Sequence, residues 1–185
     1  MTSPRVLILH GYEHHRPREH WLWWLAEELR QRDIPVQYPQ LPSPDAPRLD
    51  EWAEVATTEL GMLGDGERIV VAHSLGTVLW LHLAAAGARV DRVLLAAPPA
   101  RTRLDGPLES FIPDRLDVPA AVASSPLTLV ARNADPYRPV PLGDHTAGWP
   151  ATVIELAGDG HLIPDDGHGP FPEVLEWVTG GGWPA

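Results

Sequence analysis

The chain has 185 residues, of which 44% are hydrophobic and 21% charged, a composition typical of one globular domain over residues 1–185. It contains no cysteine, which excludes disulfides, thiolate metal sites and a cysteine nucleophile. All 14 basic residues are arginine, which excludes Schiff-base chemistry by lysine, and the 25 acidic residues bring the formal net charge to −11. Nucleic acid is not an expected partner, because no basic patch is available.

No apolar run approaches the ~20 residues of a membrane-spanning helix, and the N-terminal residues show no signal-peptide pattern. We therefore expect a cytoplasmic protein without a membrane partner. The absence of lysine and the abundance of Ala, Arg, Gly and Pro are typical of a bacterial gene of high GC content. For the quaternary state we expect a monomer or a weak homodimer.

Short apolar runs alternate with amphipathic segments along the chain. Strands are predicted at residues 6–9, 36–38, 68–72, 91–97, 127–131 and 152–156, and helices at 19–32, 50–63, 75–86 and 172–179. This alternation is typical of right-handed βαβ units, and runs that are apolar on both faces are typical of buried parallel strands. The sequence therefore predicts a three-layer α/β/α fold around a six-stranded, mostly parallel sheet with strand order 2-1-3-4-5-6.

Two segments lie outside this pattern. Residues 98–126 have no clean periodicity but contain the apolar residues Leu108, Phe111 and Ile112. They are expected either to form a small lid or pocket wall, in which Phe111 and Ile112 contact substrate, or to be a simple surface connection. The tail over residues 180–185 is expected to be frayed, unless Trp183 docks on the domain.

The most informative motif is the pentapeptide at residues 72–76, Ala-His-Ser-Leu-Gly, between the best strand and the most apolar helix. A small-x-Ser-x-Gly turn between a strand and a helix holds its serine in a strained conformation and exposes the hydroxyl above the sheet. Ser74 is therefore the candidate nucleophile, and the alternative is a serine that only caps a helix. His73 is expected to pack beside it or to contact substrate.

A serine hydroxyl is a poor nucleophile unless a base takes its proton. In α/β-hydrolases the order along the chain is serine, acid, histidine, with each residue on the loop after a strand. Asp135 and His161 follow the last two predicted strands in that order. Asp135 is expected to orient the imidazole, and His161 to abstract the Ser74 proton.

Other residues compete for these roles. His168 is the main competitor for the base, whereas Asp159 is expected to be a turn residue because glycines flank it. Asp144 and His145 are expected at the surface. The oxyanion hole needs two backbone N–H groups, which we assign to Leu75 and Tyr12. Gly11 keeps the loop free of a Cβ and is also expected to contact substrate.

Residues 13–20 contain His14, His15 and His20 together with two glutamates. These residue types bind zinc, so a metal-assisted hydrolase is an alternative. Two observations argue against it, because adjacent histidines point in different directions and no helical His-x-x-x-His pair is present. The competing interpretation is a solvated rim in which Arg16 and Arg18 screen nearby acids, and we expect no metal and no cofactor.

Seven short motifs spread over nearly the whole chain resemble the retinoblastoma-binding-protein-nine-like serine hydrolases, which are small α/β-hydrolases without a cap. They lie at residues 6–11, 20–21, 38–39, 71–76, 133–137, 160–161 and 167–172. The resemblance implies that Ser74, Asp135 and His161 are the triad and that the last motif, which contains His168, is structural. The chain departs from the family pattern at Ala134 and at the three residues after His161.

These observations predict a serine hydrolase of the carboxylesterase type. Its substrates would be small esters, with amides or peptides as further candidates, and the reaction would pass through an acyl-Ser74 intermediate. Two alternatives stay open: a non-catalytic binding module on a hydrolase scaffold, and the metal-assisted hydrolase.

Overall fold

The computed structural model describes residues 3–113, 118–123 and 125–184. At its centre is a six-stranded sheet with strand order β2-β1-β3-β4-β5-β6, in which every neighbouring pair is parallel. The predicted fold class and strand order are therefore confirmed. The strands are β1 (Pro4–Leu9), β2 (Val36–Gln37), β3 (Glu67–His73), β4 (Arg92–Ala96), β5 (Leu127–Ala134) and β6 (Ala151–Asp159).

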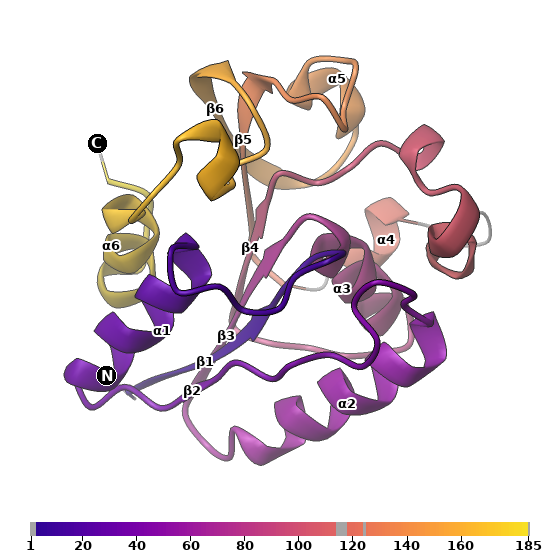
Figure 1. The fold of residues 1–185 in the computed structure, drawn as a ribbon. Helices are drawn as coiled ribbons and strands as arrows, with labels where there is room; N and C mark the ends of the chain where they lie inside the picture. Colours follow the sequence, from indigo (N-terminus) through magenta and orange to yellow (C-terminus); the bar gives the residue numbers. More distant parts are fainter. Residues whose placement is uncertain (1–2, 114–117, 124, 185) are drawn as a thin grey trace.

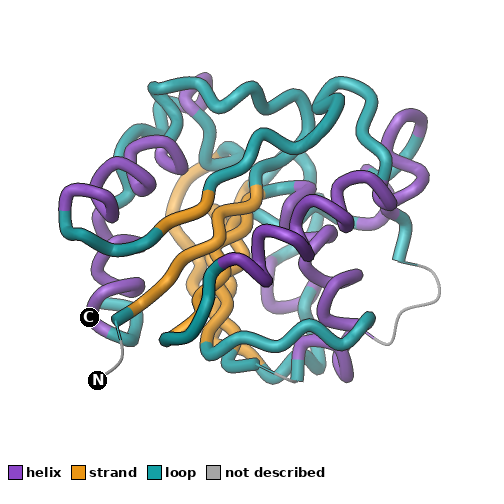
Figure 2. The backbone as a smooth tube through the Cα atoms, turned by 90° about the horizontal axis from the view of Figure 1, so that it is seen from below, coloured by secondary structure: helices purple, strands orange, loops and turns teal. Residues whose placement is uncertain are grey.

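Helices cover both faces of the sheet (Figures 1 and 2). On one face lie α1 (Trp21–Gln31) and α6 (Pro172–Gly180), and on the other α2 (Leu49–Met62), α3 (Leu75–Ala85) and α4 (Val118–Val122). Shorter helical turns are η1 (Arg101–Arg103), η2 (Gly106–Phe111), α5 (Leu142–His145) and η3 (Pro164–Asp166). None of the helices in the described ranges has the length and apolar character that a bilayer crossing requires.

Strand β1, which lies between β2 and β3, shows why a buried strand carries an unbroken run of apolar residues. Leu7 and Leu9 belong to the core beneath α2 and α3, whereas Val6 and Ile8 belong to the core beneath α1 and α6. All four are fully buried, because successive side chains of a strand point to opposite faces and both faces are covered. Each such side chain stabilises the fold by roughly 1.5–3 kcal/mol.

Strands β5 and β6 extend further than predicted. They pair as far as Ala134 and Asp159, beyond a register shift between Arg132 and Ala134. The apolar pattern stops earlier because the last residues of both strands are largely exposed. Asp135 and His161 therefore lie at the strand ends themselves, closer to the sheet than the sequence indicated.

The structure decides between the alternatives that the sequence leaves open for two segments outside the sheet. Residues 98–126 form η1, η2 and α4 rather than an irregular connection, although 114–117 and 124 fall outside the described residues. The tail is docked as far as it is described, because Gly180 ends α6 and the ring of Trp183 packs edge-on against Phe171, 5.9 Å between centroids.

Candidate active site

Ser74 occupies the sharp turn between β3 and α3. Its backbone has φ 53° and ψ −125°, a strained conformation for a residue with a side chain. Hydrogen bonds hold the turn, because the Ser74 N–H donates to the Ala96 carbonyl (3.0 Å) and the Thr77 hydroxyl donates to the Ser74 carbonyl (2.6 Å). The Ser74 side chain makes no capping bond to α3, so its hydroxyl is free for another partner.

The small residues of the motif are needed for a close approach of backbones. A Cβ on Gly76 would lie 2.5 Å from the Leu9 carbonyl oxygen and 2.7 Å from that of His10. No side chain fits there, because the first turn of α3 presses on the end of β1. Ala72, in the position where glycine is commoner, is fully buried.

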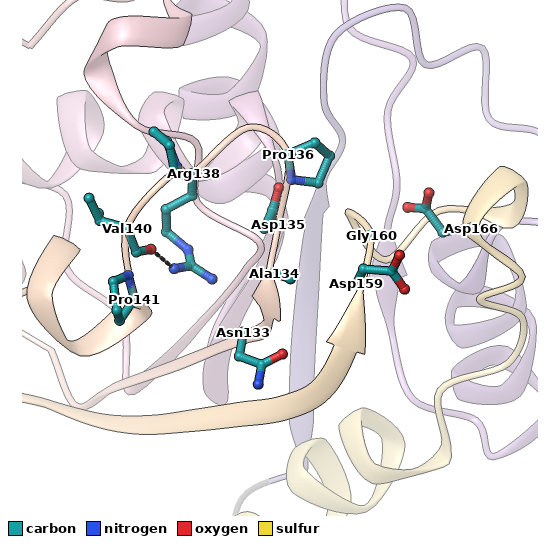
Figure 3. A pocket seen from close by; sticks show the side chains of 11 residues that line it. Asn133, Ala134, Asp135, Pro136, Arg138, Val140, Pro141, Asp159, Gly160 and Asp166 are labelled. Carbon is teal, nitrogen blue, oxygen red and sulfur yellow. Dashed lines mark hydrogen bonds between the residues drawn. The ribbon is translucent and has the colours of Figure 1, made fainter.

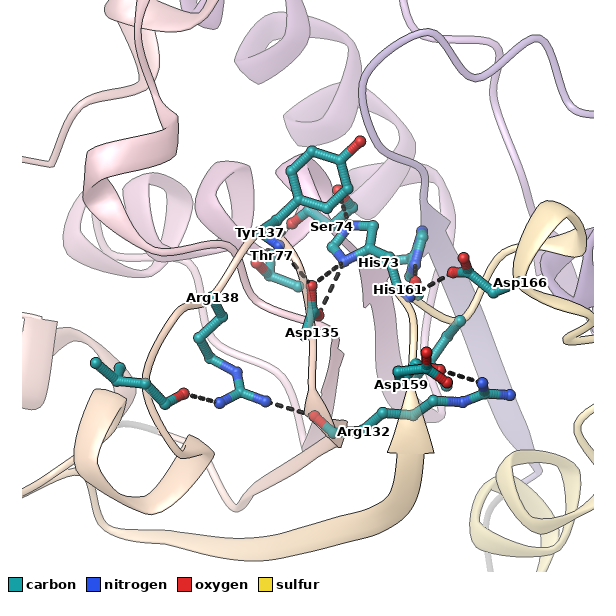
Figure 4. Close-up of polar contacts among 12 residues, drawn as sticks. His73, Ser74, Thr77, Arg132, Asp135, Tyr137, Arg138, Asp159, His161 and Asp166 are labelled. Atoms are coloured by element: carbon teal, nitrogen blue, oxygen red, sulfur yellow. Dashed lines mark hydrogen bonds and ion pairs between the residues drawn. The ribbon is translucent and has the colours of Figure 1, made fainter.

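Ser74, His161 and Asp135 form one hydrogen-bonded chain (Figure 4). Nε2 of His161 is 2.7 Å from Oγ of Ser74, and Nδ1 is 3.0 and 2.9 Å from the two carboxylate oxygens of Asp135. A carboxylate accepts only, so the imidazole carries its proton on Nδ1. Nε2 then carries a free lone pair and accepts the Ser74 O–H, which is the arrangement that a general base requires.

The Asp135 carboxylate is buried but well supplied with donors and a nearby cation. Oδ1 accepts the N–H of Tyr137 at 2.9 Å. The buried guanidinium of Arg138 donates to the carbonyls of Arg132 and Val140, which braces the loop that carries Asp135 (Figure 4). Burial lowers the pKa of Arg138, whereas the charges of Asp135 and Glu155 raise it.

The main chain around His161 is held on both sides. Its N–H donates to Oδ2 of Asp166 at 2.5 Å, and its carbonyl accepts from Nε2 of His73 at 2.8 Å. The next carbonyl, that of Leu162, accepts the indole N–H of Trp21 at 3.0 Å. Sequence reasoning did not identify Asp166, and the only signal for it was its place five residues after a candidate base.

The loop after β1 lies directly against the nucleophile. A Cβ on Gly11 would lie 2.7 Å from Cβ and 3.1 Å from Oγ of Ser74. The Tyr12 N–H has no acceptor among the described residues. Leu75 opens α3, where N–H groups lack intrahelical acceptors. Both amides are therefore available for a ligand atom beside Ser74.

A cavity of about 840 Å³ opens above Ser74 and His161, a size suited to a small-molecule ligand. Gly11, Tyr12 and His73 line this cavity. Tyr137 and His161 line it too, and the centroids of their rings are 4.5 Å apart. The side chains of its apolar wall are those of Leu75, Pro99, Leu104, Pro107, Leu108, Tyr137, Ile163 and Pro164.

Phe111 and Ile112 do not line this cavity. Phe111 is fully buried and packs edge-on against Trp52, with ring centroids 5.2 Å apart, and Ile112 packs against the same core. The expectation that these two residues contact substrate is therefore wrong. The turn η2 directs Phe111 inward, and Leu108 from the same turn lines the cavity instead.

A second cavity of about 520 Å³ lies behind the carboxylate of Asp135 (Figure 3). Asp159 and Asp166 line it together with Arg138. Asp159 ends β6, is exposed and accepts a hydrogen bond from Arg132 at its main-chain carbonyl. The expectation of a turn residue is therefore wrong, because Asp159 pairs with Ala134 at the end of the sheet.

The three histidines of the zinc alternative have separate partners. His14 is hydrogen-bonded to the Tyr38 hydroxyl (2.6 Å), and the exposed His15 to Asp45 (2.9 Å). His20 caps α1, because its Nδ1 accepts the Leu22 N–H at 3.1 Å. The described part of the chain contains no group of three or more His, Asp or Glu side chains that could hold a metal.

The remaining candidates lie apart from the hydrogen-bonded chain. His168 packs edge-on against Phe171, with ring centroids 4.7 Å apart. In α5, Asp144 is exposed and His145 half-buried. Arg16 donates to the Tyr38 carbonyl, and the Arg18 guanidinium lies 5.5 Å from the centre of the Trp23 ring.

Comparisons with known proteins identify relatives of this chain. The chain is 24% identical over 183 residues to the hydrolase YdeN of Bacillus subtilis (strain 168), with 96% of this chain and 95% of the relative covered. The crystal structure of the B. subtilis ydeN product superimposes with a TM-score of 0.79, at 25% identity over 97% of this chain and 98% of that one.

Two more distant structures share the fold. A YdeN-like hydrolase from Pectobacterium atrosepticum has a TM-score of 0.72 at 20% identity, covering 96% of this chain and 90% of its own. The esterase domain of a Rhodothermus marinus protein has a TM-score of 0.66 at 15% identity, covering 90% and 82%. The sequence profile of the serine hydrolase family matches residues 6–179. The predicted serine hydrolase family is thus confirmed, and the chain belongs to the serine hydrolase family.

Proposed function

We propose that the protein is a carboxylesterase that hydrolyses small esters through an acyl-Ser74 intermediate. The observation that carries this proposal is the hydrogen-bonded chain from the Ser74 hydroxyl through His161 to Asp135. A serine in a strained turn, an imidazole in the acceptor state and a buried carboxylate behind it are the components of serine-based acyl transfer.

In the first half of the reaction, Oγ of Ser74 attacks the ester carbonyl carbon while its proton moves to Nε2 of His161. The resulting oxyanion accepts hydrogen bonds from the N–H groups of Leu75 and Tyr12. Asp135 stabilises the imidazolium that forms. The intermediate then breaks its bond to the alkoxy oxygen, which takes the proton from His161 and leaves as the alcohol.

In the second half, water attacks the acyl-Ser74 carbonyl and gives a proton to His161. The second tetrahedral intermediate expels the Ser74 oxygen, which recovers that proton, and the carboxylic acid leaves. The proton that Ser74 gives to the alcohol is replaced by one from water, so the enzyme ends the cycle unchanged. The proposed reaction uses only the ester and water and needs no cofactor.

The apolar part of the cavity wall favours an uncharged, moderately apolar acyl group, although Glu13, Glu19, Arg103, Asp105 and Asp165 also line the cavity. Its wall carries Leu75, Leu104 and Leu108, and the Tyr137 ring borders the base. Burial of apolar substrate atoms against such a wall supplies roughly 25 cal/mol per Å². The esterase domain that shares the fold points to the same reaction class, and we propose a small-molecule ester rather than a macromolecule as the substrate.

The test is hydrolysis of p-nitrophenyl acetate and butyrate by the wild type and by Ser74→Ala. The expected result is turnover by the wild type that falls at least ~10³-fold in the variant and is indifferent to a chelator. Loss of turnover with the chelator would favour metal-assisted hydrolysis. A wild type without turnover on any ester would favour a binding module on a hydrolase scaffold.

A further inference from the structure

The proposed base lies on a loop rather than on a strand or helix. Gly160 before it has φ 106°, and Leu162 after it has φ 58°, a conformation that residues with side chains rarely adopt. Such a conformation persists only where surrounding contacts determine it. The position of the His161 ring therefore depends on what holds the main chain of this loop.

His73 holds the carbonyl side of His161. Its Nε2 lies 2.8 Å from the His161 carbonyl oxygen, which only accepts, so Nε2 carries the proton. The ring is buried, with centroids 5.0 Å from His20 and 5.8 Å from Trp21. Its Nδ1 is buried and unpartnered among the described residues.

His73 is a neutral donor at neutral pH. Burial is the largest cause that lowers its pKa well below the usual 6.5, and His20, His161 and His14 act in the same direction. Only the hydrogen bond to the His161 carbonyl raises this pKa. The neutral form already supplies the N–H that the contact requires.

Asp166 holds the amide side of the same residue. Its Oδ2 accepts the His161 N–H at 2.5 Å. The carboxylate lies so close to the loop that a Cβ on Gly160 would be 2.6 Å from Cγ of Asp166. Glycine at position 160 thus permits the contact as well as the positive φ.

We propose that His73 and Asp166 are positioning residues, and that together they clamp the peptide groups of His161 so that its ring reaches both Ser74 and Asp135. The inference rests on the proposed function of His161 as the base. His73 precedes Ser74 directly at the end of β3. The same rigid strand end therefore fixes the nucleophile and, through one hydrogen bond, the main chain of the base.

The kinetic test compares His73→Leu, which deletes the donor, with His73→Gln, which can present an amide N–H in its place. For His73→Leu we expect kcat to fall roughly 10²-fold, because an error of about 1 Å in a catalytic group has that effect. KM should change little, and His73→Gln should recover much of the loss. Asp166→Ala and Asp166→Asn form the corresponding pair, since the asparagine carbonyl still accepts a hydrogen bond.

Thr128→Val is the matched control for general destabilisation. It removes a buried hydrogen bond from the Trp177 indole (3.1 Å) near the start of β5, at the opposite edge of the sheet. It should lower stability while kcat stays at the wild-type value. The double variant His73→Leu/Asp166→Ala should lose less than the product of the two single losses, because both act on His161.

A spectroscopic readout tests the clamp without turnover. The proton between Nδ1 of His161 and the Asp135 carboxylate should give a strongly downfield ¹H NMR resonance in the wild type and in Thr128→Val. In His73→Leu the resonance should shift or broaden. If His73→Leu keeps this resonance and the wild-type kcat, the clamp is refuted while the proposed function stands. If the wild type hydrolyses no ester, the proposed function fails, and the resonance still decides on the clamp.

Discussion

Oγ of Ser74 and Nε2 of His161 lie 2.7 Å apart, although 87 positions separate the two residues in the chain. The parallel sheet accounts for this contact. Parallel strands end at the same edge, and Ser74, Asp135 and His161 follow the ends of β3, β5 and β6. Ligands in open α/β sheets bind at this carboxyl edge, and the cavity of about 840 Å³ lies there too.

Asp135→Asn should lower kcat on p-nitrophenyl butyrate on the order of 10³–10⁴-fold. An amide at this position can donate to Nδ1, so the imidazole proton can move to Nε2. Nε2 then faces Ser74 as a donor and cannot accept the hydroxyl proton. The folded state should persist, because the substitution keeps the size of a side chain that is 3% exposed. Steady-state kinetics alongside circular dichroism check both statements, and activity within tenfold of the wild type would remove Asp135 from the mechanism.

His161→Ala should lower kcat about as much as Asp135→Asn does, whereas His168→Ala should leave kcat near the wild-type value. The reason is that His161 contacts both Ser74 and Asp135, whereas His168 packs against Phe171. Parallel measurement of both variants on one ester decides between the two histidines. The opposite result would make His168 the base.

Gly76→Ala should destabilise the fold by roughly 1–3 kcal/mol or more, which is the typical cost of forcing an extra methyl group into a packed core. The new Cβ would meet main-chain oxygens at 2.5 and 2.7 Å, which cannot move without displacing β1. Gly61→Ala is the matched control, because Gly61 lies in α2 and its added Cβ would have no atom of another element within 4 Å. It should stabilise by ~0.5–1 kcal/mol, and urea titrations should show the two opposite shifts. Equal stability of both variants would contradict the close approach at Gly76.

The free energy of unfolding should fall steeply as the pH drops below about 6. Burial is the main cause that lowers the pKa of His10 to about 4, of His14 to about 2 and of His20 to about 3, and it lowers that of His73 in the same direction. Below the usual value of 6.5, the unfolded chain binds protons that the folded chain excludes. Each of these groups therefore costs about 1.4 kcal/mol of stability per pH unit until its folded pKa is reached.

Urea midpoints between pH 7.5 and 4.5 measure this dependence. His14→Gln should flatten the curve, because this substitution removes one of the buried histidines. A wild-type midpoint that is constant or rises toward pH 4.5 would contradict the account of the buried histidines.

The strands and the order of the sheet were predictable, because two covered faces force a continuous run of apolar residues through the buried middle of β1, β3 and β4. The short helices α4 and α5 were not predictable, since one or two turns carry too little periodicity to detect. The ends of β5 and β6 were missed for a different reason: their pairing is made by main-chain groups of exposed residues.

For the site, the sequence identified the residues whose chemistry is visible in their type, Ser74, Asp135 and His161. It did not identify Asp166, nor that His73 binds a carbonyl 88 positions away, because both contacts are made to the main chain of His161. Phe111 was misplaced because its hydrophobicity fits a core and a cavity wall equally well, and only the turn η2 decides between them.

The most direct test of the central claim is covalent labelling of the native protein with a fluorophosphonate, read by intact mass and by peptide mapping. A hydroxyl that donates to a buried imidazole should displace fluoride and form one stable phosphonyl adduct on Ser74. The account predicts this adduct in the wild type and its absence in Ser74→Ala. An unlabelled wild type, or equal labelling of the Ser74→Ala variant, would contradict it.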